Sequence, residues 1–312
     1  MSSDNIPFVS VIIPGCNQEK NIESTVESAI SLNEVAEVIL VNESTFNSAL
    51  EVSLKLADKY QKLKLIQLSS CRERKCMAAS RNAGILESKF NFIAFLNPGD
   101  KYLSNRFIGE KKIFDKNPDV DVIYSSVSGD SLTKNRKLGD IRQNINNKDS
   151  HIDFYKFALS HPSRHPAFHI NSITIRRNFL ITHKLFDERL MVYEDSEYWK
   201  RLLRRGRFFP GQLGDPVSVI TKSKSNNKNQ MFESISGRLK MYACFIDNIG
   251  VEQLYDFERD HLVENILRSK SRLTKNLLKR RLIYYFEKSR STFCTNQYLR
   301  SFKSKSLKTD IK

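Results

Sequence analysis

The chain has 312 residues, of which 40% are hydrophobic and 28% charged, and its net charge at pH 7 is +16. This length suits one large domain with an appendage, or two domains, and the composition is typical of a soluble globular protein. No apolar run approaches the roughly 20 residues of a membrane-spanning helix, and the N-terminal residues MSSDNIPFVS lack the pattern of a secretion signal.

Short apolar runs alternate with amphipathic stretches through the N-terminal part. The run FVSVIIP at residues 8–14 predicts a strand, and the stretch after it places Ile22, Val26 and Ile30 at helical spacing. The alternation predicts further strands at 37–41, 63–68, 90–96 and 119–127, and helices at 19–32, 47–60, 76–88 and 106–117. Strands separated by helices of about ten to fifteen residues indicate a parallel sheet that is covered on both faces.

The second half of the chain is less regular. A helix that begins with two acids and ends with arginines and a glycine is expected at 194–206, in keeping with the helix dipole. Other expected elements are a short helix at 152–159, strands at 171–177 and 215–221, a polar joint at 222–230, and three helical segments at 231–248, 252–269 and 272–289. We therefore predict an α/β domain over 1–225, with a mostly parallel central sheet, and a basic helical extension over 226–312.

In sheets of this kind, ligands bind outside the carboxyl ends of the strands. This rule places three turns on one rim, at residues 14–17, 41–45 and 96–100. The third turn, LNPGD, joins an amide, a proline, a glycine and a carboxylate at the end of a buried strand. Because Pro-Gly-Asp is also good chemistry for an ordinary tight turn, a binding site and a plain turn are both open interpretations.

Five motifs, in order, resemble those of the family 2 inverting glycosyltransferases, which have the Rossmann-like GT-A fold. The motifs cover about residues 7–221 and read VSVIIPGCNQEKNI, VILVNEST, ASRNAGI, FIAFLNPGD, and SITIRR followed by FDE and by Glu-Asp at a helix start. The resemblance implies an enzyme that transfers a sugar from a nucleotide-diphosphate donor to a saccharide acceptor, in cell-surface polysaccharide or glycan synthesis. A lipid-linked acceptor is one alternative.

The resemblance also implies roles on the donor side of the site. Asn97 would bond to the ribose, Gly99 would let the diphosphate approach closely, and Asp100 would hold Mg²⁺ or Mn²⁺, which carboxylate and phosphate oxygens bind well. The full set of implied donor-binding residues is Pro14, Asn17, Asn42, Glu43, Arg81, Asn97 and Gly99.

Two departures from the family pattern weaken the metal assignment. The family has paired Asp residues where this chain has Asn42 and Glu43, and an Asp-x-Asp where it has 97–99. Other interpretations also stay open. Asn42 would be a turn residue, Asn17 a helix cap, and Arg81 an anchor that pairs with a buried acid.

On the acceptor side, Asp195 is the expected catalytic base. Inversion is a single in-line displacement, so the base must face the leaving diphosphate across the sugar. The family's Glu-Asp motif matches Glu194 and Asp195, and Glu194 is expected to contact the acceptor. The alternative for Asp195 is that its charge only satisfies the helix dipole. The histidines of HPSRHPAFH (161–169) have no assigned role.

Positive charge is concentrated in the tail, where residues 265–312 hold fourteen Lys and Arg against Glu287 and Asp310. A basic amphipathic helix over 261–291 would suit peripheral contact with an anionic membrane, whereas packing on the body of the protein is the alternative. The absence of a recognition motif disfavours nucleic acid as a partner.

The five cysteines, Cys16, Cys71, Cys76, Cys244 and Cys294, are scattered without zinc-site spacing. We therefore expect reduced thiols and a cytoplasmic location, with the inner face of the membrane as a possible contact. A second function remains open, because Asn42 and Gly99 replace family acids: a catalytically degenerate domain that serves as a binding or scaffold subunit.

Overall fold

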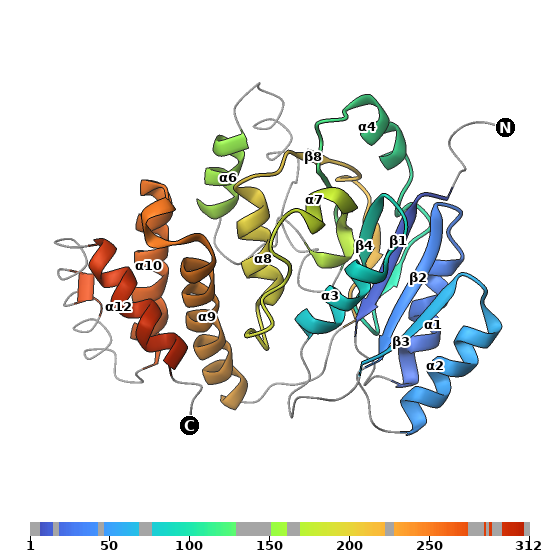
Figure 1. Cartoon of the computed structure of the whole chain (residues 1–312), viewed down its shortest axis with the longest axis horizontal. Coiled ribbons are helices and arrows are strands. Elements are labelled where there is room, and N and C mark those ends of the chain that lie inside the picture. Colours follow the sequence, from blue (N-terminus) through green and yellow to red (C-terminus); the bar gives the residue numbers. More distant parts are fainter. Residues whose placement is uncertain are drawn as a thin grey trace. The chain divides into compact units, whose positions relative to one another are not determined.

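The computed structural model describes residues 7–14, 19–42, 47–68, 77–128, 151–160, 169–221, 228–273, 284, 287–288 and 295–308. The chain divides into two compact units (Figure 1). The first comprises 1–155, 161–186 and 202–223, and the second comprises 156–160, 187–201 and 224–312. The predicted domain boundary at 225 lies near the end of the first unit, but the second unit also takes two earlier segments.

The N-terminal part alternates strands and helices as predicted. In chain order its elements are β1 (Val9–Pro14), α1 (Glu19–Ile30), β2 (Val35–Asn42), α2 (Asn47–Lys59), β3 (Leu63–Gln67), α3 (Met77–Glu87) and β4 (Phe92–Phe95). There follow β5 (Lys101–Tyr102), α4 (Glu110–Lys116), β6 (Val122–Tyr124), α6 (His151–Ser160), the 3₁₀ turn η2 (Ile170–Ser172), β7 (Ile173–Arg176), α7 (Arg177–Ile181), β8 (Phe208–Pro210) and β9 (Ser218–Val219).

The main sheet confirms the predicted fold class. In the part of the chain that the structure describes, it has seven strands in the order β3-β2-β1-β4-β7-β6-β8. Strand β7 runs antiparallel to both of its neighbours, β4 and β6, and the other pairs are parallel. The strand expected at 215–221 is not part of this sheet, because β9 pairs with β5 in a separate two-stranded ribbon.

Side chains alternate along each strand, so apolar residues lie on both faces of the sheet. Helices cover both faces. Val11 and Ile13 belong to the same buried cluster as Ile22 and Val26 of α1. Ile12 points the other way, toward α3, where a Cβ at Gly84 would lie 2.4 Å from its Cγ2 atom. Both faces are therefore buried, which explains the near-continuous apolar sequences of these strands.

Helix α4 begins at Glu110, four residues later than predicted, because the Arg106 side chain bonds to η2, β7 and Glu110. The Arg106 side chain is fully buried and forms a 2.8 Å ion pair with Glu110. Its Nε atom donates to the Asn171 carbonyl at 2.9 Å, and Nη2 donates to the Ile173 carbonyl at 2.9 Å. Burial raises the pKa of Glu110, while Arg106 opposes this shift. The pair ties the segment before α4 to η2 and β7.

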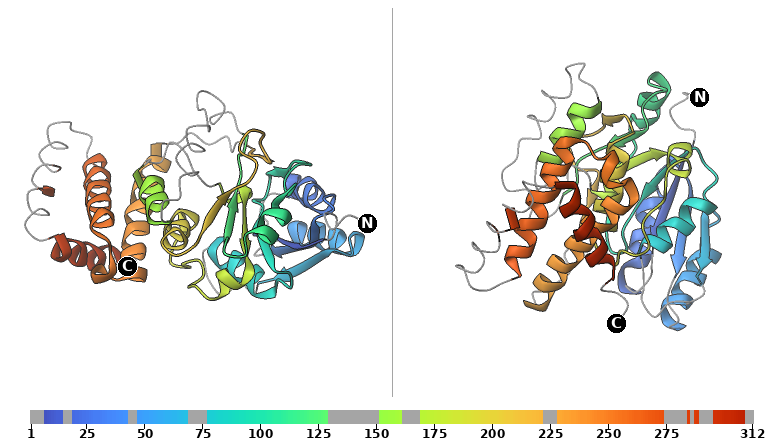
Figure 2. Two further views of the ribbon diagram at one scale, coloured as in Figure 1. Left: turned by 90° about the horizontal axis from the view of Figure 1, so that it is seen from above. Right: turned by 60° about the vertical axis from the view of Figure 1, so that its left-hand side comes forward.

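The second unit is built mainly of helices. They are α8 (Glu194–Leu203), most of which belongs to this unit, α9 (Lys228–Ile249), the 3₁₀ turn η3 (Val251–Gln253), α10 (Asp256–Arg272) and α12 (Thr295–Lys308). Helices α9, α10 and α12 pack against one another around a shared apolar cluster (Figure 2). The helical tail is thus confirmed where it is described. Most of 272–289 lies outside the described residues, and α12 was not predicted.

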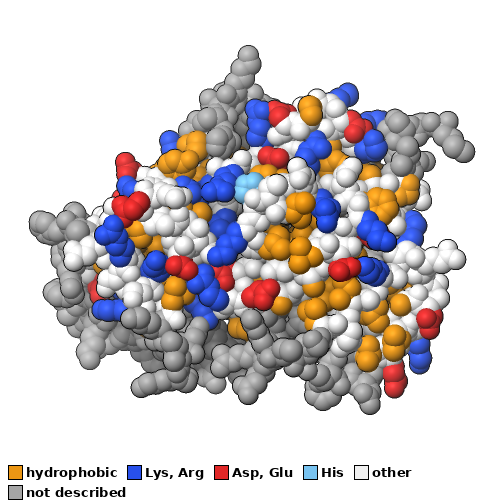
Figure 3. All heavy atoms as spheres, in the orientation of Figure 1, with side chains coloured by type: hydrophobic (Ala, Val, Ile, Leu, Met, Phe, Trp, Pro, Cys, Tyr) orange, Lys and Arg blue, Asp and Glu red, His pale blue; other side chains and the backbone are white. Residues whose placement is uncertain are grey.

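Several basic side chains of the tail are paired with acids. Arg268 lies 2.7 Å from Glu264, and Lys303 lies 3.3 Å from Asp247. On the face in Figure 3, Lys and Arg side chains are interspersed with Asp and Glu. None of the helices in the described ranges is both long and apolar enough to cross a bilayer.

Candidate functional site

The parallel strands of the first unit end on one rim, as expected. Pro14 of β1 lies opposite Val41 of β2 in the sheet register, and Asn42 lies opposite Gln67 of β3. Asn42 is fully buried, and its side-chain nitrogen donates to Gln67 Oε1 at 3.0 Å. The roles proposed for Asn42 and Pro14 stay predictions, and Asn17 and Glu43 lie outside the described residues.

The segment Asn97–Asp100 forms a tight turn directly after β4. The Asp100 N–H donates to the Asn97 carbonyl at 3.1 Å. Gly99 has a φ of 90°, which together with Pro98 before it is typical of a type II turn. The Gly99 N–H donates to the Thr25 hydroxyl of α1 at 3.0 Å. The plain-turn interpretation is therefore correct about the backbone, and the turn is held firmly in place.

Asn171, which sequence reasoning missed, ties the two ends of this turn together. Its Oδ1 accepts from the Asn97 N–H at 3.0 Å, and its Nδ2 donates to Asp100 Oδ2 at 2.8 Å. The antiparallel pairing of β4 with β7 matches Ala94 with Thr174, and continuing this register places Asn171 opposite Asn97. No motif in the sequence marks Asn171, because its role depends on that pairing.

The carboxylate of Asp100 is turned into the protein. It is only 5% exposed, Oδ1 accepts from the Thr221 N–H at 2.7 Å, and Oδ2 accepts from Asn171. Nowhere in the described ranges do three His, Cys, Asp or Glu residues gather as a metal-binding group. Both carboxylate oxygens therefore accept hydrogen bonds from the protein, and these bonds fix the turn.

Arg81 and Asn82 of α3 organise the same region. Arg81 Nη2 donates to Asn97 Oδ1 at 3.1 Å, and its guanidinium carbon lies 5.4 Å from the centre of the Phe186 ring. Asn82 exchanges two hydrogen bonds with the backbone of Phe186, at 3.0 and 2.9 Å. Arg81 therefore orients the Asn97 amide, and Asn82 holds the backbone at Phe186, just before the second-unit segment that begins at Asp187.

One of the three unassigned histidines now has a structural role. The Nδ1 atom of His169 accepts from the Asn171 N–H at 3.2 Å and caps η2. His161 and His165 lie outside the described residues.

Replacing Asn171 should loosen the turn. Asn171→Leu leaves the Asn97 N–H and the Asp100 carboxylate without their buried partner, so we expect the free energy of unfolding to fall by about 2–4 kcal/mol. Urea unfolding measures this loss. Asn178→Leu, an exposed position on α7, is the matched control and should change stability by less than about 0.5 kcal/mol. Equal, small effects of both substitutions would show that the Asn171 bonds carry little energy.

The acids predicted for the acceptor side begin helix α8, in the second unit. Glu194 is buried and Asp195 is partly exposed. Asp195 Oδ1 accepts from the Ser196 N–H at 2.6 Å and from the Ser196 hydroxyl at 3.3 Å. The structure thus brings Arg81, Asn97, Gly99 and Asp100 together in the first unit and places these two acids in the second.

Burial and nearby charges shift the pKa of two basic side chains, Lys200 on α8 and His261 on α10. Burial lowers the pKa of Lys200, and the charges of Asp195 and Glu197 oppose that shift. Burial also lowers the pKa of His261 on α10 to about 4, and the charge of Lys200 adds to this effect. Glu197 is fully buried and accepts from Arg201 at 2.7 Å.

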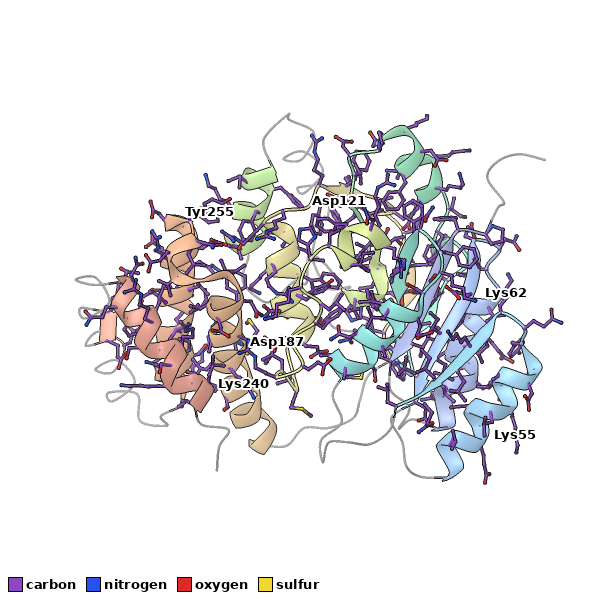
Figure 4. The ribbon with its side chains drawn as sticks, in the orientation of Figure 1. Lys55, Lys62, Asp121, Asp187, Lys240 and Tyr255 are labelled. Atoms are coloured by element: carbon purple, nitrogen blue, oxygen red, sulfur yellow. The ribbon has the colours of Figure 1, made fainter. Side chains whose placement is uncertain are left out.

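Asp187, labelled in Figure 4, lies at the start of the segment that leads to α8, and hydrogen bonds hold its carboxylate. Burial acts to raise the pKa of Asp187, but hydrogen bonds from Arg189 and Asn248 outweigh burial and lower the pKa to about 2. Asn248 lies on α9 and donates to Asp187 Oδ2 at 3.0 Å and to Glu197 Oε1 at 2.8 Å. These bonds fix α9 to both ends of the segment.

The sequence matches the model of a protein family described as "Glycosyl transferase family 2" over residues 10–180, more than half of the chain. It is 24% identical over 246 residues to the minor teichoic acid biosynthesis protein GgaA of Bacillus subtilis, covering 72% of this chain and 51% of that protein. It is 30% identical over 102 residues to the uncharacterized glycosyltransferase EpsJ of the same organism, covering 32% and 28%. The chain spans about half the length of GgaA and less of EpsJ.

Solved structures share the fold. Residues 1–349 of TarS from S. aureus superpose with a TM-score of 0.62 at 15% identity, covering 96% of this chain and 88% of that one. The same TarS segment has been solved in complex with UDP-GlcNAc. The mannosyltransferase PcManGT of Pyrobaculum calidifontis, solved with GDP-Man and Mn²⁺, has a TM-score of 0.54 at 14% identity and covers 97% and 87%.

Proposed function

The chain belongs to glycosyl transferase family 2, and we propose that it is an inverting glycosyltransferase that transfers a sugar from a nucleotide-diphosphate donor to a saccharide acceptor. The observation that carries this proposal is the fixed turn Asn97–Asp100 at the carboxyl end of β4, with Arg81 bonded to the Asn97 amide. Ligands of such sheets bind at this rim. Similarity to GgaA supports a role in cell-surface glycan synthesis.

The donor would lie along the rim of the first unit. The Asn97 amide, oriented by Arg81, would bond to the ribose, and Gly99, which has no side chain, would let the diphosphate approach closely. We propose that Asn42 and Glu43 contact the base, and that Pro14 and Asn17 also contribute to donor binding. Asn42 can accept from a base N–H through its oxygen without carrying charge. These roles deepen the family assignment and are proposals for each residue.

The chemical step is one displacement. The acceptor hydroxyl attacks the anomeric carbon, a new C–O bond forms there, and the bond to the diphosphate oxygen breaks. Asp195 takes the proton of the hydroxyl, and the nucleoside diphosphate leaves with the bonding electrons. A general base is worth about 10²–10⁴ in rate. Glu194 would contact the acceptor.

Mg²⁺ or Mn²⁺ would neutralise charge on the leaving diphosphate, and a structural neighbour was solved with Mn²⁺. Because the Asp100 carboxylate is already bonded to Thr221 and Asn171, we propose that Asp100 supports the turn.

Titration of UDP-sugars and GDP-sugars, each with and without Mn²⁺, tests the function. We expect saturable binding of one donor in calorimetry and release of its nucleoside diphosphate when a saccharide acceptor is added. Stronger binding with Mn²⁺ would show that a cation takes part. No binding of any donor at about millimolar concentration, the weak end of biological affinities, would contradict the enzyme.

The second candidate, a scaffold subunit on a degenerate domain, is favoured by the internal bonding of Asp100 and by the missing family acids at Asn42 and Gly99. It predicts binding without turnover in the same titration.

We also propose a cytoplasmic location, with the basic tail making peripheral contact with an anionic membrane. Sedimentation with anionic vesicles, but not neutral ones, would support that contact.

A further inference from the structure

Tyr193, the residue immediately before Glu194 and Asp195, has a left-handed backbone. Its φ is 64°, and within the described residues no other non-glycine residue has a positive φ. Bulky L side chains avoid this conformation because Cβ crowds the backbone. The Tyr193 carbonyl accepts from the Glu197 N–H at 3.0 Å. This conformation therefore sets how the chain enters the first turn of α8.

A glycine on α9 makes room for the strained segment. A Cβ at Gly237 would lie 2.3 Å from Val192 Cγ2 and 3.5 Å from Tyr193 Cδ2, so the segment rests directly on the helix backbone. Glycine inside a helix lowers its stability relative to alanine. The guanidinium carbon of Arg238 lies 5.5 Å from the centre of the Tyr193 ring, and Nη2 donates to the hydroxyl at 3.5 Å.

Two residues that are unfavourable in their local structure, the left-handed Tyr193 and a glycine inside helix α9, thus touch each other. Proteins keep such residues where the surrounding structure fixes them and where function depends on them. We propose that the left-handed Tyr193 backbone, seated on Gly237, is a positioning device, which holds the first turn of α8 and so sets the direction of the Asp195 carboxylate. This inference rests on the proposed function, because Tyr193 acts through the proposed base.

A rescue experiment on the full chain tests the device. In Gly237→Ala the new methyl group collides with Val192 and displaces the segment, so we expect kcat to fall by about tenfold or more, with the affinity for the donor unchanged. Val192→Ala removes the colliding Cγ2 atom. The double variant should therefore recover kcat to within about threefold of the unchanged protein, and Val192→Ala alone should keep it.

A second pair of variants probes the backbone itself. Tyr193→Asn suits the left-handed conformation and should retain most of kcat, whereas the β-branched Tyr193→Val should lose about tenfold or more. The inference is wrong if Gly237→Ala keeps full kcat, if Val192→Ala fails to rescue it, or if Asn and Val at 193 behave alike. Absence of transfer by the unchanged protein would contradict the proposed function instead.

Discussion

Asp195→Asn is expected to lower kcat for sugar transfer by about 10²–10⁴-fold, because an amide cannot take the proton of the acceptor hydroxyl. Donor affinity should stay within about twofold, since the donor residues proposed lie in the other unit and a base acts on the reaction step rather than on donor binding. Steady-state kinetics with a saccharide acceptor, together with calorimetry of the donor alone, measure the two quantities separately.

Asp256→Asn is the matched control for Asp195→Asn. Asp256 also begins a helix of the second unit, α10, and its side chain is 95% exposed. If Asp195 only satisfied the helix dipole, both substitutions would cost about 0.3–1 kcal/mol of stability and leave kcat intact. A kcat loss confined to Asp195→Asn supports the base, and equal kcat in both variants rules it out.

Arg106→Met is expected to destabilise the first unit by about 3–5 kcal/mol, the cost of leaving one partner of a buried ion pair without the other. Arg106 is fully buried, and Glu110 is 1% exposed. The substitution also removes the hydrogen-bond donor to the carbonyl of Asn171, the residue whose side chain ties the turn Asn97–Asp100. Hydrogen exchange of the β4 and β7 amides reports the loss within this unit directly.

Adding Glu110→Leu should recover at least about 1 kcal/mol of that loss, because it removes the uncompensated buried charge. Lys111→Met is the control on the same helix. Its partner Asp115 has a side chain that is 58% exposed, so the substitution should cost less than about 1 kcal/mol. A double variant as unstable as Arg106→Met would show that the charge of Glu110 is not the cause.

Local patterns predicted most of the elements and part of the site. The apolar alternation located β1, β2, β3 and β4 to within two residues, and the acids at 194–195 marked the start of α8. The sequence Pro-Gly-Asp also indicated the turn that Asn97–Asp100 adopts. Such features depend on neighbours along the chain, so they can be read without the fold.

Two features that the local patterns did not show, the late start of α4 and the pairing of β9, depend on tertiary contacts. Helix α4 starts late because Arg106 is drawn into the core by Glu110 and the β7 backbone. The strand expected at 215–221 pairs with β5 rather than with the main sheet, since Ser218 also bonds the Lys101 carbonyl at 2.8 Å. Neither partner is visible in the sequence around these residues.

By itself, therefore, the sequence determined the alternating α/β plan, the family motifs and the type of the turn after β4. Only the tertiary structure decided what holds that turn. Asp100 bonds to Asn171 and Thr221, which lie 71 and 121 residues further along the chain, and it meets them through strand pairing. Spacing patterns carry no record of that pairing, because hydrogen-bond register links residues across the sheet and not along the chain.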